Sequence, residues 1–207
     1  MALPPMWIKI CGMTTPDAIA TALEAGADAI GFVFAESPRQ LTPEAAAQLA
    51  RPARGRVRCV AVTRHPLQGA LDEMLRVFRP DVLQTDDGDF AGLELPASLE
   101  RLPVVRAGDG SPAHLAARIL FEGPASGTGT TSDWTAARRL AARTQLVLAG
   151  GLDAGNVAEA IAAVHPFGVD VSSGVEARPG VKSPLKIMQF VTAARTAAAT
   201  SASEDPS

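Results

Sequence analysis

Short, almost continuously apolar runs recur along this 207-residue chain at a roughly regular spacing. A run that is apolar at every position, rather than at every second one, is typical of a parallel strand covered on both faces. Such strands need helices over both faces of their sheet, so these runs constrain the fold more than any other feature. We expect eight strands, at residues 7–11, 29–34, 58–63, 81–85, 103–107, 118–121, 145–149 and 168–171.

The segments between the runs carry helix-start signals. A threonine or serine directly before a proline caps the first helical turn and presets its backbone angle, and four such pairs open segments of this chain. The stretch 86–95 is short and interrupted by glycine, so we expect the helix after the fourth strand to be weak or missing. The expected helices span 16–26, 43–51, 67–78, 112–117, 133–142, 155–164 and 184–195.

Repeated strand and helix units leave two architectures, an open doubly wound sheet or a closed (β/α)₈ barrel. Eight strands favour closure, and the chain is close to the minimum length for a barrel of this kind. We therefore expect an α/β fold, a single TIM barrel over residues 1–195 with short loops. Residues 196–207 lack periodicity, and we expect them to form a disordered tail.

Composition excludes several classes of function. Aromatic residues make up 4% of the chain and the formal net charge is −3, so neither stacking faces nor a basic field is offered to nucleic acid. Hydrophobic residues reach 47%, but no run is long enough for a membrane span. The two cysteines and three histidines lack metal-ligand spacing, so no metal site is expected. The first residues do not read as a signal peptide, and we expect a cytoplasmic protein with reduced thiols.

Polar residues cluster at the carboxyl ends of the expected strands, where a barrel places its active site. Cys11 ends the first strand, and its thiolate could act as a base or nucleophile if Lys9 and Arg39 lowered the pKa of the thiol. Glu122 ends the sixth strand, where a catalytic carboxyl group and a salt-bridged or solvated one are equally consistent with its position. Cys59 lies inside the third strand, and we expect it to be a packing residue.

Glycine and serine follow the seventh and eighth strands, the place where barrels commonly bind phosphate. Gly150 and Gly151 would let the backbone approach an anion, and Ser173 with Gly174 would add a hydroxyl and N–H donors. Glycines there also make ordinary left-handed turns, but two such pairs on neighbouring strands favour the phosphate interpretation. The glycine-rich stretch 126–130 would lie next to them.

A series of motifs runs in order along nearly the whole chain. They are Lys9-Ile10-Cys11-Gly12-Met13-Thr14, Gly31-Phe32-Val33-Phe34, Ser37-Pro38-Arg39, Gly127-Thr128-Gly129, Asp133-Trp134, Ala149-Gly150-Gly151-Leu152, Asn156-Val157, Val169-Asp170-Val171-Ser172-Ser173-Gly174-Val175-Glu176, Pro179-Gly180 and Lys182. Together they resemble the phosphoribosylanthranilate isomerases of tryptophan biosynthesis. The resemblance implies a (β/α)₈ enzyme that converts N-(5′-phosphoribosyl)anthranilate into 1-(o-carboxyphenylamino)-1-deoxyribulose 5-phosphate. This Amadori rearrangement, an aldose-to-ketose isomerisation, uses neither a metal nor an organic cofactor.

The resemblance also implies roles for single residues. Cys11 would remove the C2′ proton, after the acid at the end of strand six has protonated the ribose ring oxygen. Arg39 would bind the anthranilate carboxylate, and an arginine fork suits that group. Phosphate binding would fall to Gly150, Gly151, Ser173 and Gly174, with help from Gly127 and Gly129.

Three positions depart from the family pattern, and one of them is harmless: Ser183 replaces the aspartate that usually follows the lysine of the last motif, where it caps the final helix ahead of Pro184. The family acid is usually aspartate, whereas strand six ends here in Glu122, so we expect Glu122 to be the general acid, with the backbone around Gly123 compensating for the extra methylene. After strand four the usual Gln-Leu-His-Gly reads Gln84-Thr85-Asp86-Asp87. We expect Gln84 and Asp86 to contact the substrate, and a share of the acid role stays open for Asp86.

Other interpretations stay open. A catalytically impaired homologue would keep phosphate and carboxylate binding, and only the departures at Glu122 and Asp86 favour it. Another sugar-phosphate isomerase of barrel fold is disfavoured, because a pentose-phosphate epimerase needs metal ligands and a dual-substrate isomerase would carry an acid where Cys11 stands. The small-molecule substrate is the expected partner, and the family contains both monomers and homodimers.

Overall fold

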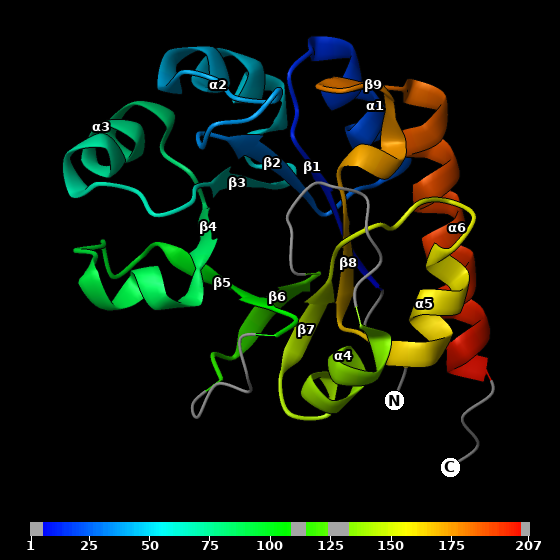
Figure 1. Cartoon of the computed structure of the whole chain (residues 1–207). Helices are drawn as coiled ribbons and strands as arrows, with labels where there is room; N and C mark the ends of the chain where they lie inside the picture. The colour runs from blue at the N-terminus through cyan, green and yellow to red at the C-terminus, as the bar shows by residue number, and fades with distance from the viewer. Residues whose placement is uncertain (1–5, 109–114, 124–132, 204–207) are drawn as a thin grey trace.

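The computed structural model of the chain closes eight parallel strands into a barrel. Its description covers residues 6–108, 115–123 and 133–203. Each strand pairs with the next, and β1 pairs with β8 to close the ring, which confirms the expected (β/α)₈ barrel (Figure 1). The strands are β1 Trp7–Cys11, β2 Ala29–Val33, β3 Arg58–Val62, β4 Val82–Asp86, β5 Glu100–Arg106, β6 Arg118–Glu122, β7 Gln145–Leu148 and β8 Gly168–Val171.

Helices surround the strands, and α5 and α6 lie side by side (Figure 1). None of the helices that the structure describes has the length and apolar character of a membrane span. The α-helices are α1 Pro16–Ala25, α2 Pro43–Ala50, α3 Gln68–Phe78, α4 Trp134–Ala141, α5 Val157–Val164 and α6 Pro184–Ser203. Within the described ranges the short 3₁₀ helices are η1 Arg51–Ala53, η2 Asp87–Gly92 and η3 Ser173–Val175, and a hairpin is formed by β9 Glu176–Arg178 and β10 Val181–Lys182.

Two of the predicted helix starts, those before α1 and α2, act as expected, whereas the one at Ser111-Pro112 lies outside the described residues. The hydroxyl of Thr15 accepts a hydrogen bond from the Ala18 N–H, and Thr42 caps α2 in the same way with proline as the next residue. Each hydroxyl partners an N–H that the first helical turn leaves unbonded, while the proline needs no such partner. Gly26 ends α1 at φ 80°, a left-handed conformation that glycine adopts without strain.

The structure differs from the sequence predictions in three places. Residues 115–117, the described part of the helix expected at 112–117, are not helical. The disordered tail expected from residue 196 is wrong for 196–203, because α6 continues to Ser203 on alanines that favour helix and that pack partly against the core. The hairpin β9–β10 was not predicted, whereas the weak connection after β4 is confirmed as the 3₁₀ helix η2.

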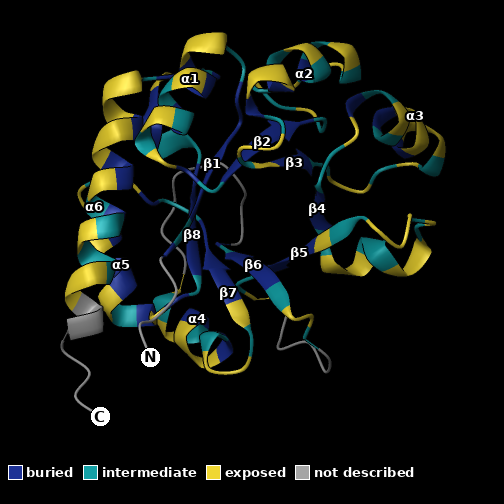
Figure 2. Cartoon of the chain, turned by 180° about the vertical axis from the view of Figure 1, so that it is seen from behind, coloured by how far each residue is buried: buried dark blue, intermediate teal, exposed yellow. Residues whose placement is uncertain are grey.

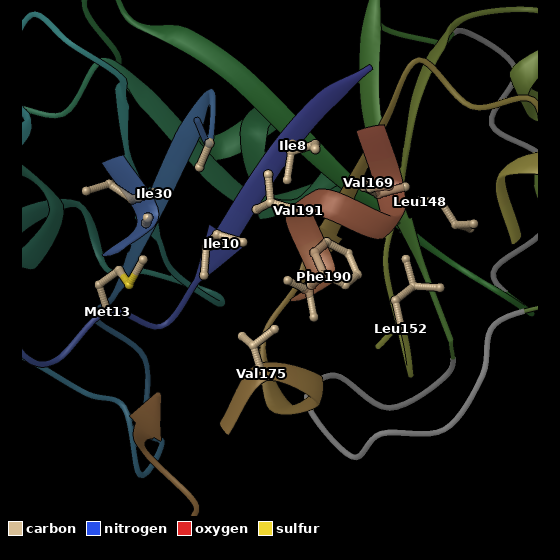
Figure 3. Packing of buried hydrophobic residues seen from close by; sticks show 14 of the residues in the cluster. Ile8, Ile10, Met13, Ile30, Leu148, Leu152, Val169, Val175, Phe190 and Val191 are labelled. Carbon is tan, nitrogen blue, oxygen red and sulfur yellow. The ribbon is translucent and has the colours of Figure 1, made fainter. Parts of the chain in front are cut away.

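The side chains of each strand alternate between the barrel interior and the layer beneath the helices. Buried residues dominate the strands, and the exposed ones lie on the outer faces of the helices (Figure 2). In the outer layer, Ile8 and Ile10 of β1 face Phe190 and Val191 of α6 (Figure 3). The interior cluster consists of Ala29, Val60, Val82, Leu102, Val104, Leu120, Val147 and Ala149.

Candidate active site

The alternation along the strands decides which polar side chains enter the barrel. Because Ile8 and Ile10 face the helices, Cys11 and Lys9 face the interior, and Glu122 shares the inward face of β6 with Leu120. The same argument directs Gln84, Asp86 and Arg106 inward from the carboxyl ends of β4 and β5. These ends form the face on which barrel enzymes carry out their chemistry.

Cys11 is buried above an ion pair inside the barrel. Lys9 Nζ donates to Asp170 Oδ1 at 2.7 Å, and the Lys9 side chain is fully buried. Burial raises the pKa of the Cys11 thiol, and although Lys9 and Lys182 lower it, the net direction is upward. The condition set out from the sequence, that neighbouring cations lower the pKa of this thiol, is not met in the resting structure, because desolvation outweighs the effect of Lys9 and Lys182.

Arg106 joins the two carboxylates at this end of the barrel. It is hydrogen-bonded to Asp86 through Nη1, and its Nη2 lies 3.0 Å from Glu122 Oε1. All three side chains are 14% exposed or less, so water screens these charges weakly. The guanidinium therefore bridges the two acids. The structure brings Asp86 and Glu122 together through a shared cation that was not among the predicted site residues.

Gln84 offers an acceptor with no partner in the described part of the chain. It is 7% exposed, and its Oε1 atom is buried without a hydrogen bond. A buried amide oxygen left unbonded costs free energy, so a ligand donor at this place would be stabilising. The predicted substrate contact at Gln84 thus has a physical basis in the structure.

Arg39 lies on the loop after β2 and is held by a carboxylate. Its Nε donates to Glu176 Oε1 at 2.6 Å and its Nη2 to Glu176 Oε2 at 2.9 Å. Glu176 in turn accepts from Lys182 Nζ at 3.0 Å. The hydrogen bond and the charge of Glu176 raise the pKa of the Arg39 guanidinium, against the effect of burial. Arg39 is therefore a fixed cation.

The loops after β7 and β8 pack against each other. A Cβ atom on Gly174 would lie 2.0 Å from the Leu152 carbonyl oxygen, so only glycine allows this approach. Gly150 and Gly151 have φ values of 89° and 64°, and Ser173 begins the short helix η3. A barrel phosphate site commonly combines these two loops with a short extra helix. Gly127 and Gly129, the other predicted phosphate contacts, lie outside the described residues.

A histidine and two aspartates at the rim come close to a metal-binding geometry. One ligand atom from each of His65, Asp86 and Asp89 lies within 4.8 Å of the others. The groups already have partners, since Asp86 pairs with Arg106 and Asp89 Oδ2 accepts from Thr85 Oγ1 at 2.5 Å. Arginine beside Asp86 opposes a second cation there, and we assign no metal to this cluster.

Comparison with known proteins decides which barrel family this is. Residues 8–193 match the family model of N-(5'phosphoribosyl)anthranilate (PRA) isomerase. The chain belongs to this family.

Relatives of this isomerase family match the chain over nearly its full length. The N-(5'-phosphoribosyl)anthranilate isomerase of Rhizobium rhizogenes is 40% identical over 90% of this chain and 92% of its own. The crystal structure of TrpF from Jonesia denitrificans has a TM-score of 0.78 and 35% identity, covering 93% and 98% of the two chains. A phosphoribosyl anthranilate isomerase in complex with reduced 1-(o-carboxyphenylamino)-1-deoxyribulose 5-phosphate has a TM-score of 0.74 and 28% identity, covering 92% and 99%.

Sequence reasoning alone missed three members of this isomerase's site. Glu176 and Lys182 stand in the motifs quoted above without an assigned role, and Arg106 was given no role from the sequence. A signal for the first two was present: two charged residues flank Pro179-Gly180, a pair that favours a tight turn and hence a hairpin that pairs them.

Proposed function

We propose that this isomerase catalyses the Amadori rearrangement of N-(5′-phosphoribosyl)anthranilate, with Cys11 as base and Glu122 as acid. Membership of the family supports the reaction. The observation that carries the residue assignment is the inward placement of a thiol and a carboxyl group on the carboxyl ends of β1 and β6. Such groups can hold and transfer protons on opposite sides of a small sugar.

The reaction then runs through four proton transfers. Glu122 donates a proton to the ribose ring oxygen, the C1′–O bond breaks, and a Schiff base to the anthranilate nitrogen forms. The Cys11 thiolate removes the C2′ proton, and the electron pair of that C–H bond gives an enolamine. Protonation at C1′ and loss of the C2′ hydroxyl proton turn the enolamine into the ketone. Each step rearranges bonds within one molecule, so no redox partner is consumed.

The resting charges oppose these roles. The pKa of Cys11 is raised, so its thiol carries a proton, while Arg106 favours the carboxylate of Glu122. The active form is then the minor one, in which the proton has moved from Cys11 to Glu122. Asp86 supports this form, because it keeps Arg106 paired when Glu122 becomes neutral.

The remaining predicted residues bind the two anionic ends of the substrate. Arg39 binds the anthranilate carboxylate as a fixed cation, and Gln84 accepts from a sugar hydroxyl with its unbonded Oε1. Gly150, Gly151, Ser173 and Gly174 bind the phosphate through backbone N–H groups and a hydroxyl. Because a phosphate ester crosses lipid poorly, we propose the cytoplasm as the place of action.

Freshly prepared phosphoribosylanthranilate tests this proposal through the loss of anthranilate-type fluorescence. The wild-type protein should consume it, and Glu122→Gln should lower kcat by about 10²–10⁴-fold, the usual contribution of a general acid. Glu159→Gln, on the exposed side of α5, is the matched control and should keep wild-type turnover.

Two results would count against the proposal. Tight binding without turnover in the wild type would select the impaired homologue, and near-normal turnover in Glu122→Gln would remove the acid assignment.

A further inference from the structure

Glu176 occupies both donors on one edge of the Arg39 guanidinium. Two parallel hydrogen bonds, 2.6 and 2.9 Å long, join Nε and Nη2 of Arg39 to the two oxygens of Glu176. The side chains are 12% and 6% exposed, so the pair is shielded from water. A planar fork held in this way cannot rotate without breaking both bonds.

The other edge of the same guanidinium stays available. A guanidinium has five N–H donors, of which Glu176 takes two. The edge formed by Nη1 and the second Nη2 hydrogen has no partner among the residues that the structure describes. This edge can make a second bidentate pair, and a carboxylate is the group that matches it.

Glu176 is itself fixed by a buried lysine. Lys182 Nζ donates to Glu176 Oε1, to the Ser172 carbonyl oxygen at 2.9 Å and to Ser172 Oγ at 3.2 Å. The Lys182 side chain is fully buried, and these bonds use all three of its donors. Lys182 also pairs with Glu176 in the β9–β10 register, so the hairpin itself sets where the carboxylate lies.

The hairpin is docked closely on the loops that carry the reactive groups. Thr14 Oγ1 donates to the Gly180 carbonyl oxygen at 2.6 Å. A Cβ on Gly180 would lie 2.5 Å from the Pro38 carbonyl oxygen, and one on Gly12 would lie 2.5 Å from Arg39 Cδ. Both glycines also have positive φ values, 79° and 80°. Close approach at both points links β9–β10, the Arg39 loop and the turn after Cys11 into one unit.

The network carries a surplus of positive charge. Arg39 and Lys182 are cations and Glu176 is one anion, while the neighbouring Lys9 is already neutralised by Asp170. Burial would raise the pKa of Glu176, but Arg39 and Lys182 lower it below its usual value, so this group stays ionised. One further negative group would complete the charge balance, and the free edge of Arg39 is where it can bind.

We propose that Glu176 is a positioning residue that holds Arg39 for bidentate binding of the substrate carboxylate. This inference rests on the proposed function, which supplies the aromatic carboxylate. Lys182 holds the Glu176 carboxylate by a hydrogen bond, and both residues belong to the β9–β10 hairpin. Glu176 touches no reacting atom and acts only through Arg39.

Two inert ligands separate this role from a merely structural one. The first is the reduced product, 1-(o-carboxyphenylamino)-1-deoxyribitol 5-phosphate, and the second is the same compound without the carboxylate. The wild-type protein should bind the first at least about tenfold more tightly, since charged hydrogen bonds are worth that much. In Glu176→Gln this preference should fall below about threefold, while the Kd of the carboxylate-free compound changes less than threefold. Glu73→Gln, on exposed α3, is the matched control.

Other outcomes overturn the inference. A preference in Glu176→Gln within twofold of the wild type would show that Arg39 needs no positioning. Equal weakening of both ligands would show a structural role. Failure of the wild type to bind either ligand would overturn the proposed function together with the inference, and is distinct from both.

If Glu176→Gln does not fold, the carboxylate preference is measured in Glu176→Asp instead. It keeps the charge that Lys182 needs but shortens the side chain by one methylene, so both bonds to Arg39 cannot persist. The same loss of carboxylate preference is expected, with KM for the substrate raised more than kcat is lowered. A preference kept by this variant would contradict the inference.

Discussion

Cys11 shows how one residue meets opposing demands at the residue scale. Burial disfavours its thiolate, while the cations of Lys9 and Lys182 favour it, and burial has the larger effect. A base that is protonated at rest is protected from oxidation, because the thiolate is the reactive form. In the proposed mechanism it becomes a base only when a partner accepts its proton, and we propose Glu122 as that partner.

Direct titration of the thiols tests this picture. In Cys59→Ala protein, thiolate absorbance near 240 nm should report Cys11 with a midpoint above 9.0, its ordinary value. In Cys11→Ala protein the remaining thiol, Cys59, should titrate near pH 11. Since a raised pKa keeps a thiol neutral at lower pH, both proteins should show little thiolate at pH 7. A Cys11 midpoint at or below pH 8 would contradict the account.

The positions of the site residues were predictable, but their partners were not. Strand alternation and strand ends suffice to direct Cys11 and Glu122 into the barrel mouth, because a parallel barrel puts all carboxyl ends on one face. The shared role of Arg106 depends on the register between β4, β5 and β6, which single-strand patterns do not contain. The net pKa of Cys11 depends on burial, which likewise follows only from the closed structure.

At the element scale, close packing determines the approach of two loops and the length of one helix. The loops after β7 and β8 meet at Gly174, and α6 extends its apolar contacts past the end expected from the sequence. Helix starts were readable because Thr-Pro and Ser-Pro pairs act locally. The end of α6 was not, because its alanines favour a helix while the serines and threonines between them favour it less, and the contacts of Ala197 and Ala198 with the core follow only from the folded structure.

Gly174→Ala should disturb the phosphate loops. The added methyl would lie 2.0 Å from the Leu152 oxygen, so the two loops must move apart. We expect a loss of about 1–3 kcal/mol in the free energy of unfolding, and a raised KM for the phosphorylated substrate. Thermal unfolding and steady-state kinetics measure both effects. Gly155→Ala, whose Cβ would meet only the Asp153 side chain at 3.2 Å, is the control, and equal effects in the two variants would refute this packing argument.

Removing residues 196–207 should destabilise the barrel. The deletion takes away Ala197 and Ala198, which pack partly against the core, and the last turns of α6. The expected loss is on the order of 1 kcal/mol, which lowers the Tm by about 2–4 °C in a chain of this size. A chain that lacks only 204–207 serves as the reference. An unchanged Tm in the longer deletion would show that residues 196–203 add no stability.

At the scale of the whole molecule, closure of the barrel makes the site. Residues that are far apart in sequence, such as Lys9 and Asp170, become an ion pair only because β1 pairs with β8. The fold itself was predictable, since eight apolar runs separated by helices leave few alternatives. The β9–β10 hairpin after β8 is not part of the repeated strand and helix unit, so the repeat did not predict it. This hairpin supplies Glu176 and Lys182.

The central claim is that a single thiol at the barrel mouth is the base, and a pair of alanine variants tests it most directly. The chain has two cysteines, both buried, and only Cys11 lies at the carboxyl end of its strand. With phosphoribosylanthranilate as substrate, Cys11→Ala should lower kcat/KM by at least about 10²-fold, while Cys59→Ala, measured on folded protein, should stay within about threefold of the wild type. A Cys11→Ala enzyme that keeps kcat/KM within threefold of the wild type would contradict the account.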